Sequence, residues 1–236
     1  MTARKMLAVF GATLLLITSA PLGAATPEES FRKHFPSIRA DSIRPASVKG
    51  LYEIVSGSEV FYYVPGPEYR IYGAIITKDR RNLTQERVLE ILTRNLKNAP
   101  LEKAVKIGSG PHTVIEITDP DCSYCRQASA FLSKRNDVTR YIFFFPLSIH
   151  PNAGAKIRYI FCAADRQRAY EEAMTGKLDN MQFTLCEDAA AVESLRTHTE
   201  IATRIGVTGT PLFLIDGQVV GGADIPRMEK ILDGKK

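Results

Sequence analysis

Two cysteines separated by two residues, in the segment TDPDCSYC, constrain this chain more than any other feature of its sequence. Cys122 and Cys125 follow the apolar run TVIEI, which is typical of a buried strand, and the residues after them favour a helix to about Lys134. A pair placed in this way can bind a metal ion, form an inert disulfide or exchange electrons with other thiols. The rest of the sequence distinguishes these possibilities.

A zinc site needs about four ligands at suitable spacing, and the remaining candidates do not supply them. Cys162 and Cys186 are far apart, and the four histidines are scattered along the chain, with His150 expected in a loop before a helix. An inert disulfide is disfavoured because a C-x-x-C ring at a helix start is tight and usually reducible. The pattern therefore favours a redox pair, and it implies no metal and no organic cofactor.

Helix geometry gives the two cysteines different roles. The first turn of a helix presents free N–H groups and the positive end of the dipole to Cys122, which stabilises its thiolate. Asp119 and Asp121 oppose this effect and Arg126 supports it. We expect an accessible Cys122 to attack a disulfide of another protein, and a deeper, protonated Cys125 to resolve the mixed disulfide.

The N-terminus has the pattern of a secretory signal peptide. Arg4 and Lys5 precede an apolar run, and small residues at Ala24 and Ala25 suit cleavage. Removing the two positive charges lowers the formal net charge from +5 to +3, which gives no argument for a nucleic-acid partner. No later segment is long and apolar enough to be expected to span a membrane. Disulfide chemistry is permitted in an oxidising compartment.

Three short runs between Phe35 and Thr77 predict strands: GLYEIV, SEVFYYV and YRIYGAIIT, separated by the turn segments SGS and PGPE. A unit of roughly 50 residues with one small sheet buries too little apolar surface to be comfortably stable alone. It must dock on the rest of the chain or pair with a copy of itself through exposed edges, and the second option predicts a dimer.

The segment NLTQERVLEILTRNLKNAP predicts a helix that begins at Asn82, with Gln85 as its partner in the first turn, and ends before Pro100. This helix either packs on its own domain or links two domains. After Leu101 strands and helices alternate, in an α/β order with a helical insertion. The expected strands are KAVKIG, HTVIEIT, YIFFFPL and a PLFLI–QVVGG hairpin, and the expected helices are 153–164, 166–174, 189–205 and IPRMEKILDG.

The pair in TDPDCSYC, with GVTGTP far downstream, resembles the thioredoxin fold. More narrowly, the chain is similar to the periplasmic disulfide isomerases of the DsbC/DsbG type. The matching segments are, in order, IRPASVKGLYEI, EVFYYV, T-D-x-x-C-x-Y-C, FCAADRQRAYEEAMTGK and G-V-x-G-T-P. Together they cover essentially all of the chain after the signal peptide. The Ser-Tyr dipeptide between the cysteines departs from the Gly-Tyr or Pro-Tyr that is more usual in this family.

The resemblance implies a domain order. A signal peptide (1–24) precedes a small mainly-β, cystatin-like dimerisation domain (25–80), a linker helix (81–100) and a thioredoxin-like catalytic domain with a helical insertion (101–236). It also implies that the Thr210–Pro211 bond is cis, faces Cys122 and positions an extended substrate.

The four cysteines permit three pairings. The resemblance implies a structural disulfide between Cys162 and Cys186, the functional alternative being a second redox relay. Thioredoxin and the DsbA-type oxidases resemble this chain in carrying a buried acid at the position of Glu116. One hypothesis is that Glu116 shuttles the proton of Cys125, and the alternative is a solvent-facing glutamate at an edge position.

The predicted function is that of a periplasmic, homodimeric thiol–disulfide isomerase or reductase acting on misfolded or oxidised secreted proteins. A membrane thiol reductant of the DsbD type would keep the pair reduced. Two alternatives remain open at this stage: a reductase of sulfenylated single cysteines, and a redox-independent periplasmic chaperone.

Overall fold

The computed structural model of the chain describes residues 25–179 and 186–234. The predicted signal peptide, 1–24, lies outside the described residues. Over the two described ranges, every helix is too short or too polar to cross a membrane.

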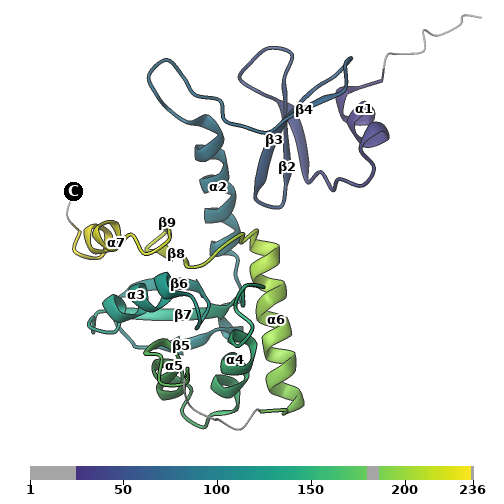
Figure 1. Cartoon of the computed structure of the whole chain (residues 1–236). Helices are drawn as coiled ribbons and strands as arrows, with labels where there is room; N and C mark the ends of the chain where they lie inside the picture. Colours follow the sequence, from purple (N-terminus) through teal and green to yellow (C-terminus); the bar gives the residue numbers. More distant parts are fainter. Residues whose placement is uncertain (1–24, 180–185, 235–236) are drawn as a thin grey trace, which may run out of the picture.

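The N-terminal unit is one antiparallel sheet with a helix against it (Figure 1). The strand order is β1-β2-β3-β4, so β1 and β4 are the sheet edges. A buried aromatic cluster that includes Phe31, Phe61 and Tyr63 joins the helix to the sheet. The elements are α1 (Pro27–His34), β1 (Ser42–Pro45), β2 (Tyr52–Ser56), β3 (Glu59–Val64) and β4 (Tyr69–Ile71).

The sequence prediction for this unit was incomplete. The third run, YRIYGAIIT, forms a strand only at Tyr69–Ile71, because the backbone of Ile75 bonds Leu83 and Thr84 at the start of the next helix and does not pair with β3. Helix α1 was missed, although it carries a capping box in which Thr26 and Glu29 bond each other's backbone N–H groups.

Helix α2 (Leu83–Lys97) connects the two units. Its predicted N-cap is confirmed, because the Asn82 side chain accepts a hydrogen bond from the Gln85 amide at 2.9 Å. Ile91 packs with the N-terminal sheet, whereas Leu96 belongs to the core of the C-terminal unit. The helix therefore contributes to two cores.

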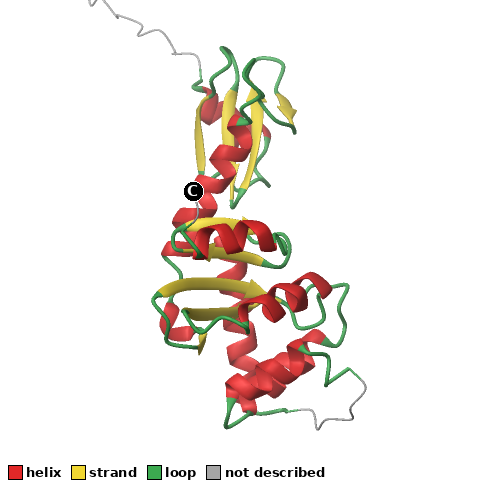
Figure 2. Ribbon diagram, turned by 90° about the vertical axis from the view of Figure 1, so that its left-hand side faces the viewer, coloured by secondary structure: helices red, strands yellow, loops and turns green. Residues whose placement is uncertain are grey.

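The C-terminal unit contains a five-stranded sheet in the order β5-β7-β6-β8-β9. Strands β6 and β7 are parallel and the other pairings are antiparallel. Figure 2 shows the N-terminal sheet standing beyond one side of this sheet, with strands that run in a different direction. The strands are β5 (Val105–Ile107), β6 (His112–Thr118), β7 (Val138–Phe144), β8 (Leu212–Ile215) and β9 (Gln218–Gly221).

Helices cover both faces of this sheet. Alternation along β6 sends Val114 toward α3 and α7, and Ile115 and Ile117 toward α2 and α6. The predicted α/β thioredoxin-like fold with a helical insertion, α4 and α5, is confirmed. The remaining elements are η1 (Leu101–Lys103), α3 (Ser123–Leu132), α4 (Ala153–Cys162), α5 (Arg166–Met174), α6 (Ala189–Ile205) and α7 (Ile225–Leu232).

Two details test the local predictions. The β8–β9 hairpin turns at Asp216 and Gly217, which have φ of 45° and 84°, as a two-residue Asp-Gly turn requires. The strand expected over YIFFFPL instead spans Val138–Phe144. It ends where the Phe145 amide donates to the Thr118 carbonyl, and the chain leaves the sheet in a loop beside the cysteine pair.

Candidate active site

Cys122 and Cys125 lie at the start of α3, at the end of the sheet where β6 finishes. Cys122 is the N-cap residue and Cys125 lies in the first turn, and both are free thiols. Cys125 is fully buried, and Cys122 keeps only 6% of its surface exposed. The sulfur of Cys122 is thus less accessible than the sequence suggested, because the loop before β8 covers it.

That loop carries Thr210 and Pro211, which are far from Cys122 in sequence. The Thr210–Pro211 bond is cis. The thiol of Cys122 donates to the Thr210 carbonyl oxygen, with 3.5 Å between sulfur and oxygen. The structure therefore brings the C-x-x-C pair and the G-T-P segment together.

The surroundings of Cys125 favour its protonated form. Burial raises the pKa of Cys125 well above that of an ordinary thiol, and the hydroxyls of Thr210 and Thr118 only partly oppose this. Both hydroxyl oxygens are buried and have no hydrogen-bond partner within residues 25–179 and 186–234. The Asp119 amide donates to the Cys125 sulfur at 3.4 Å. The two threonine hydroxyls and the Asp119 amide could therefore donate to a Cys125 thiolate when it forms during the reaction.

Glu116 is fully buried, so the solvent-facing alternative is wrong. Its carboxylate pairs with Arg140 at 2.7 Å and accepts a hydrogen bond from the Tyr170 hydroxyl at 2.9 Å. Arg140 also bonds Ser129 on the active-site helix. Among the described residues, no hydrogen bond joins Glu116 to Cys125, and the proton-shuttle hypothesis stays a prediction.

Asp119, just after β6, is a fully buried residue that joins the cysteine turn to the loop after β7. Its carbonyl accepts from the Cys122 amide at 3.1 Å, and its side chain accepts from the amides of Asp121 and Leu147 at 2.8 Å each. His150 lies in the loop before α4, as expected, and its Nδ1 contacts the same carboxylate at 2.8 Å.

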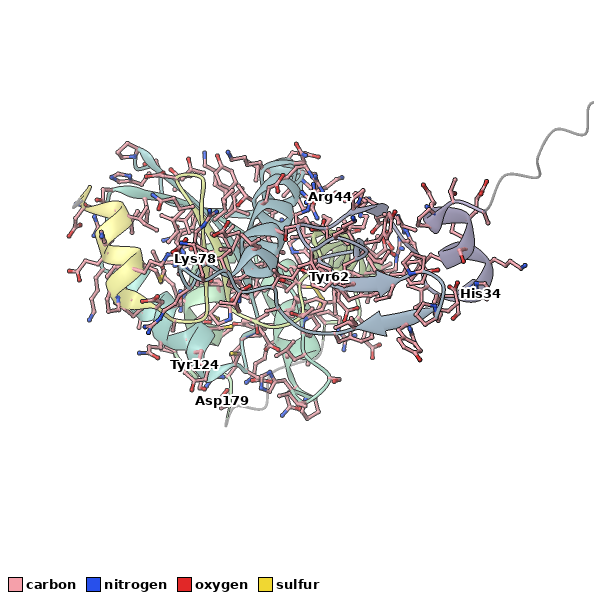
Figure 3. The ribbon with its side chains drawn as sticks, turned by 90° about the horizontal axis from the view of Figure 1, so that it is seen from above. His34, Arg44, Tyr62, Lys78, Tyr124 and Asp179 are labelled. Carbon is pink, nitrogen blue, oxygen red and sulfur yellow. A yellow bond between two sulfur atoms is a disulfide. The ribbon has the colours of Figure 1, made fainter. Side chains whose placement is uncertain are left out.

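A network of four charged side chains flanks the cysteine turn. Arg126 binds Asp179 through two nitrogens, at 2.6 and 2.7 Å, and also approaches Asp121. Lys156, almost completely buried, pairs with both Asp121 and Asp179. The hydrogen bond and charge of Arg126, aided by Lys156, lower the pKa of Asp179. Figure 3 shows Asp179 near Tyr124, far from His34 at the other end of the molecule.

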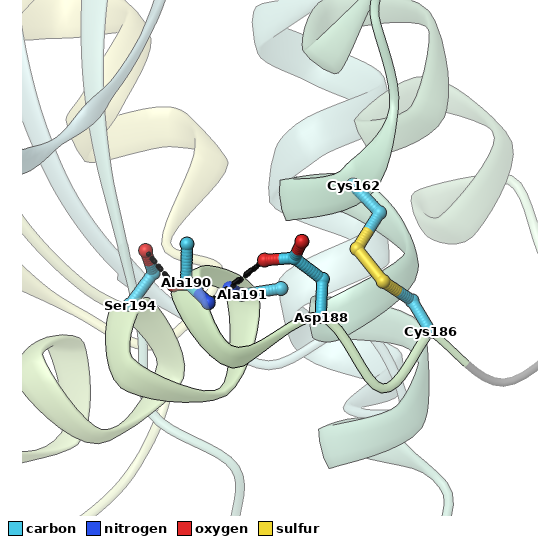
Figure 4. Close-up of a disulfide and its surroundings, with 6 residues drawn as sticks. All are labelled: Cys162, Cys186, Asp188, Ala190, Ala191 and Ser194. Carbon is cyan, nitrogen blue, oxygen red and sulfur yellow. Dashed lines mark hydrogen bonds between the residues drawn. A yellow bond between two sulfur atoms is a disulfide. The ribbon is translucent and has the colours of Figure 1, made fainter.

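The second pair of cysteines forms a disulfide in the structure, shown in Figure 4. Cys162 is the last residue of α4, and Cys186 precedes α6. The side chain of Asp188 caps α6 by accepting from the amides of Ala190 and Ala191. This disulfide joins the helical insertion to the following helix.

A C-x-x-C pair at a helix start, opposite a cis-proline on this sheet, defines the thioredoxin-like class of thiol–disulfide oxidoreductases. The comparisons with known proteins agree. Residues 100–235, more than half of the chain, match the thioredoxin-like domain, and residues 18–85 match the disulfide bond isomerase protein N-terminal domain.

Curated relatives match over most of the chain. The probable thiol:disulfide interchange protein DsbC of Bordetella avium is 29% identical, over 81% of this chain and 68% of the relative. The thiol:disulfide interchange protein DsbC of Escherichia coli is 27% identical, over 83% of this chain and 82% of the relative. A disulfide interchange protein of Neisseria gonorrhoeae superposes with a TM-score of 0.49 at 27% identity, over 57% of this chain and 96% of the other. The chain belongs to the thioredoxin-like family, and over most of its length it is similar to the DsbC proteins.

Proposed function

We propose that Cys122 is the attacking thiol and Cys125 the resolving thiol of this isomerase. The Cys122 thiolate attacks one sulfur of a client disulfide, forms a mixed disulfide and expels the other client sulfur as a thiolate. In isomerisation, a client thiolate then attacks the mixed disulfide and returns Cys122 to its thiolate form. In reduction, Cys125 loses its proton and attacks Cys122, which releases the reduced client and leaves a Cys122–Cys125 disulfide.

The observation that carries this assignment is the asymmetry between the two sulfurs. Cys122 lies at the helix start, against the loop of a cis-proline, whereas Cys125 is fully buried with a raised pKa. A helix N-terminus stabilises a thiolate through its free N–H groups and dipole. The attacking and the resolving thiol thus differ in their position and burial.

Thr210 and Pro211 are proposed to position the client. The Thr210 carbonyl already accepts from Cys122, so its backbone lies where an extended client segment passes the attacking sulfur. A pocket opens beside this loop, at the junction with α2 and the N-terminal sheet. Its lining is largely apolar side chains and backbone, and includes Val60, Val88, Leu92, Val207, Gly209 and Leu212.

The N-terminal unit (25–80) is proposed to be a dimerisation domain, with 81–100 as the linker helix and 101–236 as the catalytic domain. Strand β4 is a sheet edge with exposed large side chains: Tyr69 is 64% exposed and Ile71 43%. Exposed apolar edge strands pair readily with another chain. Sedimentation should give a dimer, and a Tyr69→Lys variant should shift it toward the monomer.

We further propose that residues 1–24 direct the protein to the periplasm. Its clients there are misfolded or oxidised secreted proteins. A membrane thiol reductant of the DsbD type keeps Cys122 and Cys125 reduced, because an isomerase needs a free thiolate to begin. The family assignment favours this function over the reductase of single sulfenylated cysteines and over the redox-independent chaperone.

Trapping the mixed disulfide tests the assignment. A Cys125→Ser variant cannot resolve, so it should accumulate a covalent complex with scrambled ribonuclease that is visible on a non-reducing gel. A Cys122→Ser variant should form none. Trapping by Cys122→Ser and not by Cys125→Ser would reverse the two roles.

A further inference from the structure

Without a charge on His150, negative side chains outnumber positive ones beside the cysteine turn. Asp121 and Asp179 are paired with Arg126 and Lys156, so two acids meet two bases. The carboxylate of Asp119 is a third acid in the same place, and it is fully buried directly before the cysteine turn.

His150 is the titratable base that contacts Asp119. Its side chain is 21% exposed, and its Nδ1 lies 2.8 Å from Asp119 Oδ2. Because a carboxylate oxygen accepts, Nδ1 carries the hydrogen and donates. Arg126 also acts on Asp119 through its charge, but its guanidinium is bonded to Asp179, Asp121 and the Pro120 carbonyl. A protonated His150 completes a neutral cluster of three acids and three bases.

We propose that His150 is a positioning residue for the thiol chemistry, whose imidazolium balances the charge of Asp119 beside the cysteines and thereby governs how readily Cys122 attacks. A negative charge near a thiol disfavours its thiolate, and a balancing positive charge removes that penalty. Histidine ordinarily changes charge between about pH 5 and 8, so the proposed control should vary across this range. The inference rests on the proposed role of Cys122 as the attacking thiol.

The chain offers a matched control at the opposite end of the same strand. His112 opens β6, and its Nδ1 contacts the Asp216 carboxylate at 2.6 Å. Asp119 follows the other end of β6. Replacing either histidine by asparagine keeps a side-chain N–H near the position of Nδ1 but removes the charge, and only the His150 pair lies beside the cysteines.

The test is the alkylation rate of Cys122 in the reduced full-length protein, followed by mass spectrometry from about pH 5 to pH 8. His150→Asn should slow alkylation roughly three- to tenfold near pH 6, as expected for an unbalanced charge at short range. The difference should shrink toward pH 8, because a histidine ordinarily loses its charge between about pH 5 and 8. His112→Asn should follow the unchanged protein at every pH.

A second variant separates charge from folding. With Asp119→Asn there is no charge to balance, so adding His150→Asn should change the rate by less than about twofold. A pH-independent loss in His150→Asn, or a profile identical to that of His112→Asn, would overturn the inference while leaving the function intact. Failure of Cys122 to react in the unchanged protein would instead contradict the proposed function.

Discussion

The two cysteine pairs of this protein border one hydrophobic cluster but occupy opposite ends of helices. Cys122 is the N-cap of α3, whereas Cys162 is the last residue of α4. Cys122 and Cys125 belong to the cluster, and Cys186 packs against it. The positive end of a helix dipole favours a thiolate and the negative end opposes it. Asp188, close in sequence to Cys186, adds a further negative charge to the second pair.

The comparison shows that exposure alone does not decide the role of a cysteine, because the more exposed pair is the bonded one. Cys122 and Cys125 are buried and face a cis-proline loop. Cys162 is exposed and Cys186 half-buried, yet these two are bonded and join two helical segments. We infer that the first pair cycles between thiol and disulfide and that the second remains bonded.

The largest expected effect separates the pairs by activity. Cys122→Ser should reduce the reshuffling of scrambled ribonuclease to the uncatalysed rate, because no other thiol occupies the helix start. Cys162→Ala/Cys186→Ala should keep a rate close to that of the unchanged protein. Full activity in Cys122→Ser would favour the chaperone alternative, and loss of activity in a folded double variant would favour a second redox relay.

A second prediction concerns the buried ion pair beneath the redox pair. Glu116→Gln leaves Arg140 buried without its countercharge, so the free energy of unfolding should fall by about 3–5 kcal/mol. Denaturant unfolding measures this, with Glu193→Gln, from an exposed pair with Arg196, as a control whose unfolding midpoint should not move.

The same Glu116→Gln variant tests the proton-shuttle hypothesis. If Glu116 carries the proton of Cys125, resolution of the mixed disulfide should slow while formation is unchanged. Unchanged rates of both steps would remove the hypothesis and leave the carboxylate a structural partner of Arg140.

A third prediction sharpens the structural role of the second pair. Cys162 and Cys186 are 24 residues apart. Opening a loop of this size should cost about 3 kcal/mol in the chain-entropy treatment. Thermal unfolding of Cys162→Ala/Cys186→Ala, compared with that of Cys122→Ser/Cys125→Ser without added reductant, measures it. Equal stability of the two double variants would contradict the division between the pairs.

The smallest predicted effect is a pH dependence of the free energy of unfolding, and it comes from His198 near the bonded cysteine pair. Buried His198 packs on Phe161, accepts from the Phe144 amide through Nδ1 and contacts the Lys103 carbonyl through Nε2. Burial lowers the pKa of His198 from 6.5 to about 4. Its neutral form stabilises the fold fully above about pH 6.5, and this contribution is lost as pH falls toward 4, by at most about 3 kcal/mol. A His198→Gln variant should show a flatter pH profile of stability; an unchanged slope would contradict this role.

Short-range patterns were the ones that the sequence could predict. The cap at Asn82, the turn at Asp216–Gly217 and the cysteine pair opening α3 each depend on residues within a few positions of one another. Helix α1 also had such a signal, in the capping box of Thr26, which lies directly beside the expected cleavage site.

The charges around the site could not be predicted, because they join residues that periodicity does not relate. Glu116 pairs with Arg140 on the neighbouring strand, and Asp119 contacts His150, which lies beyond that strand. Arg126 pairs with Asp179, which follows a helix of the insertion. Strand register and the path of the insertion set these contacts. The sequence therefore identified Asp119, Asp121 and Arg126 near the cysteines, but not their distant partners His150, Lys156 and Asp179.

The most direct test of the account is selective labelling of the reduced protein at neutral pH with a small alkylating reagent, read by mass spectrometry. The different environments of the two sulfurs predict rapid modification of Cys122 and almost none of Cys125. Equal labelling of both thiols, or faster labelling of Cys125, would contradict the division of roles on which the proposed mechanism depends.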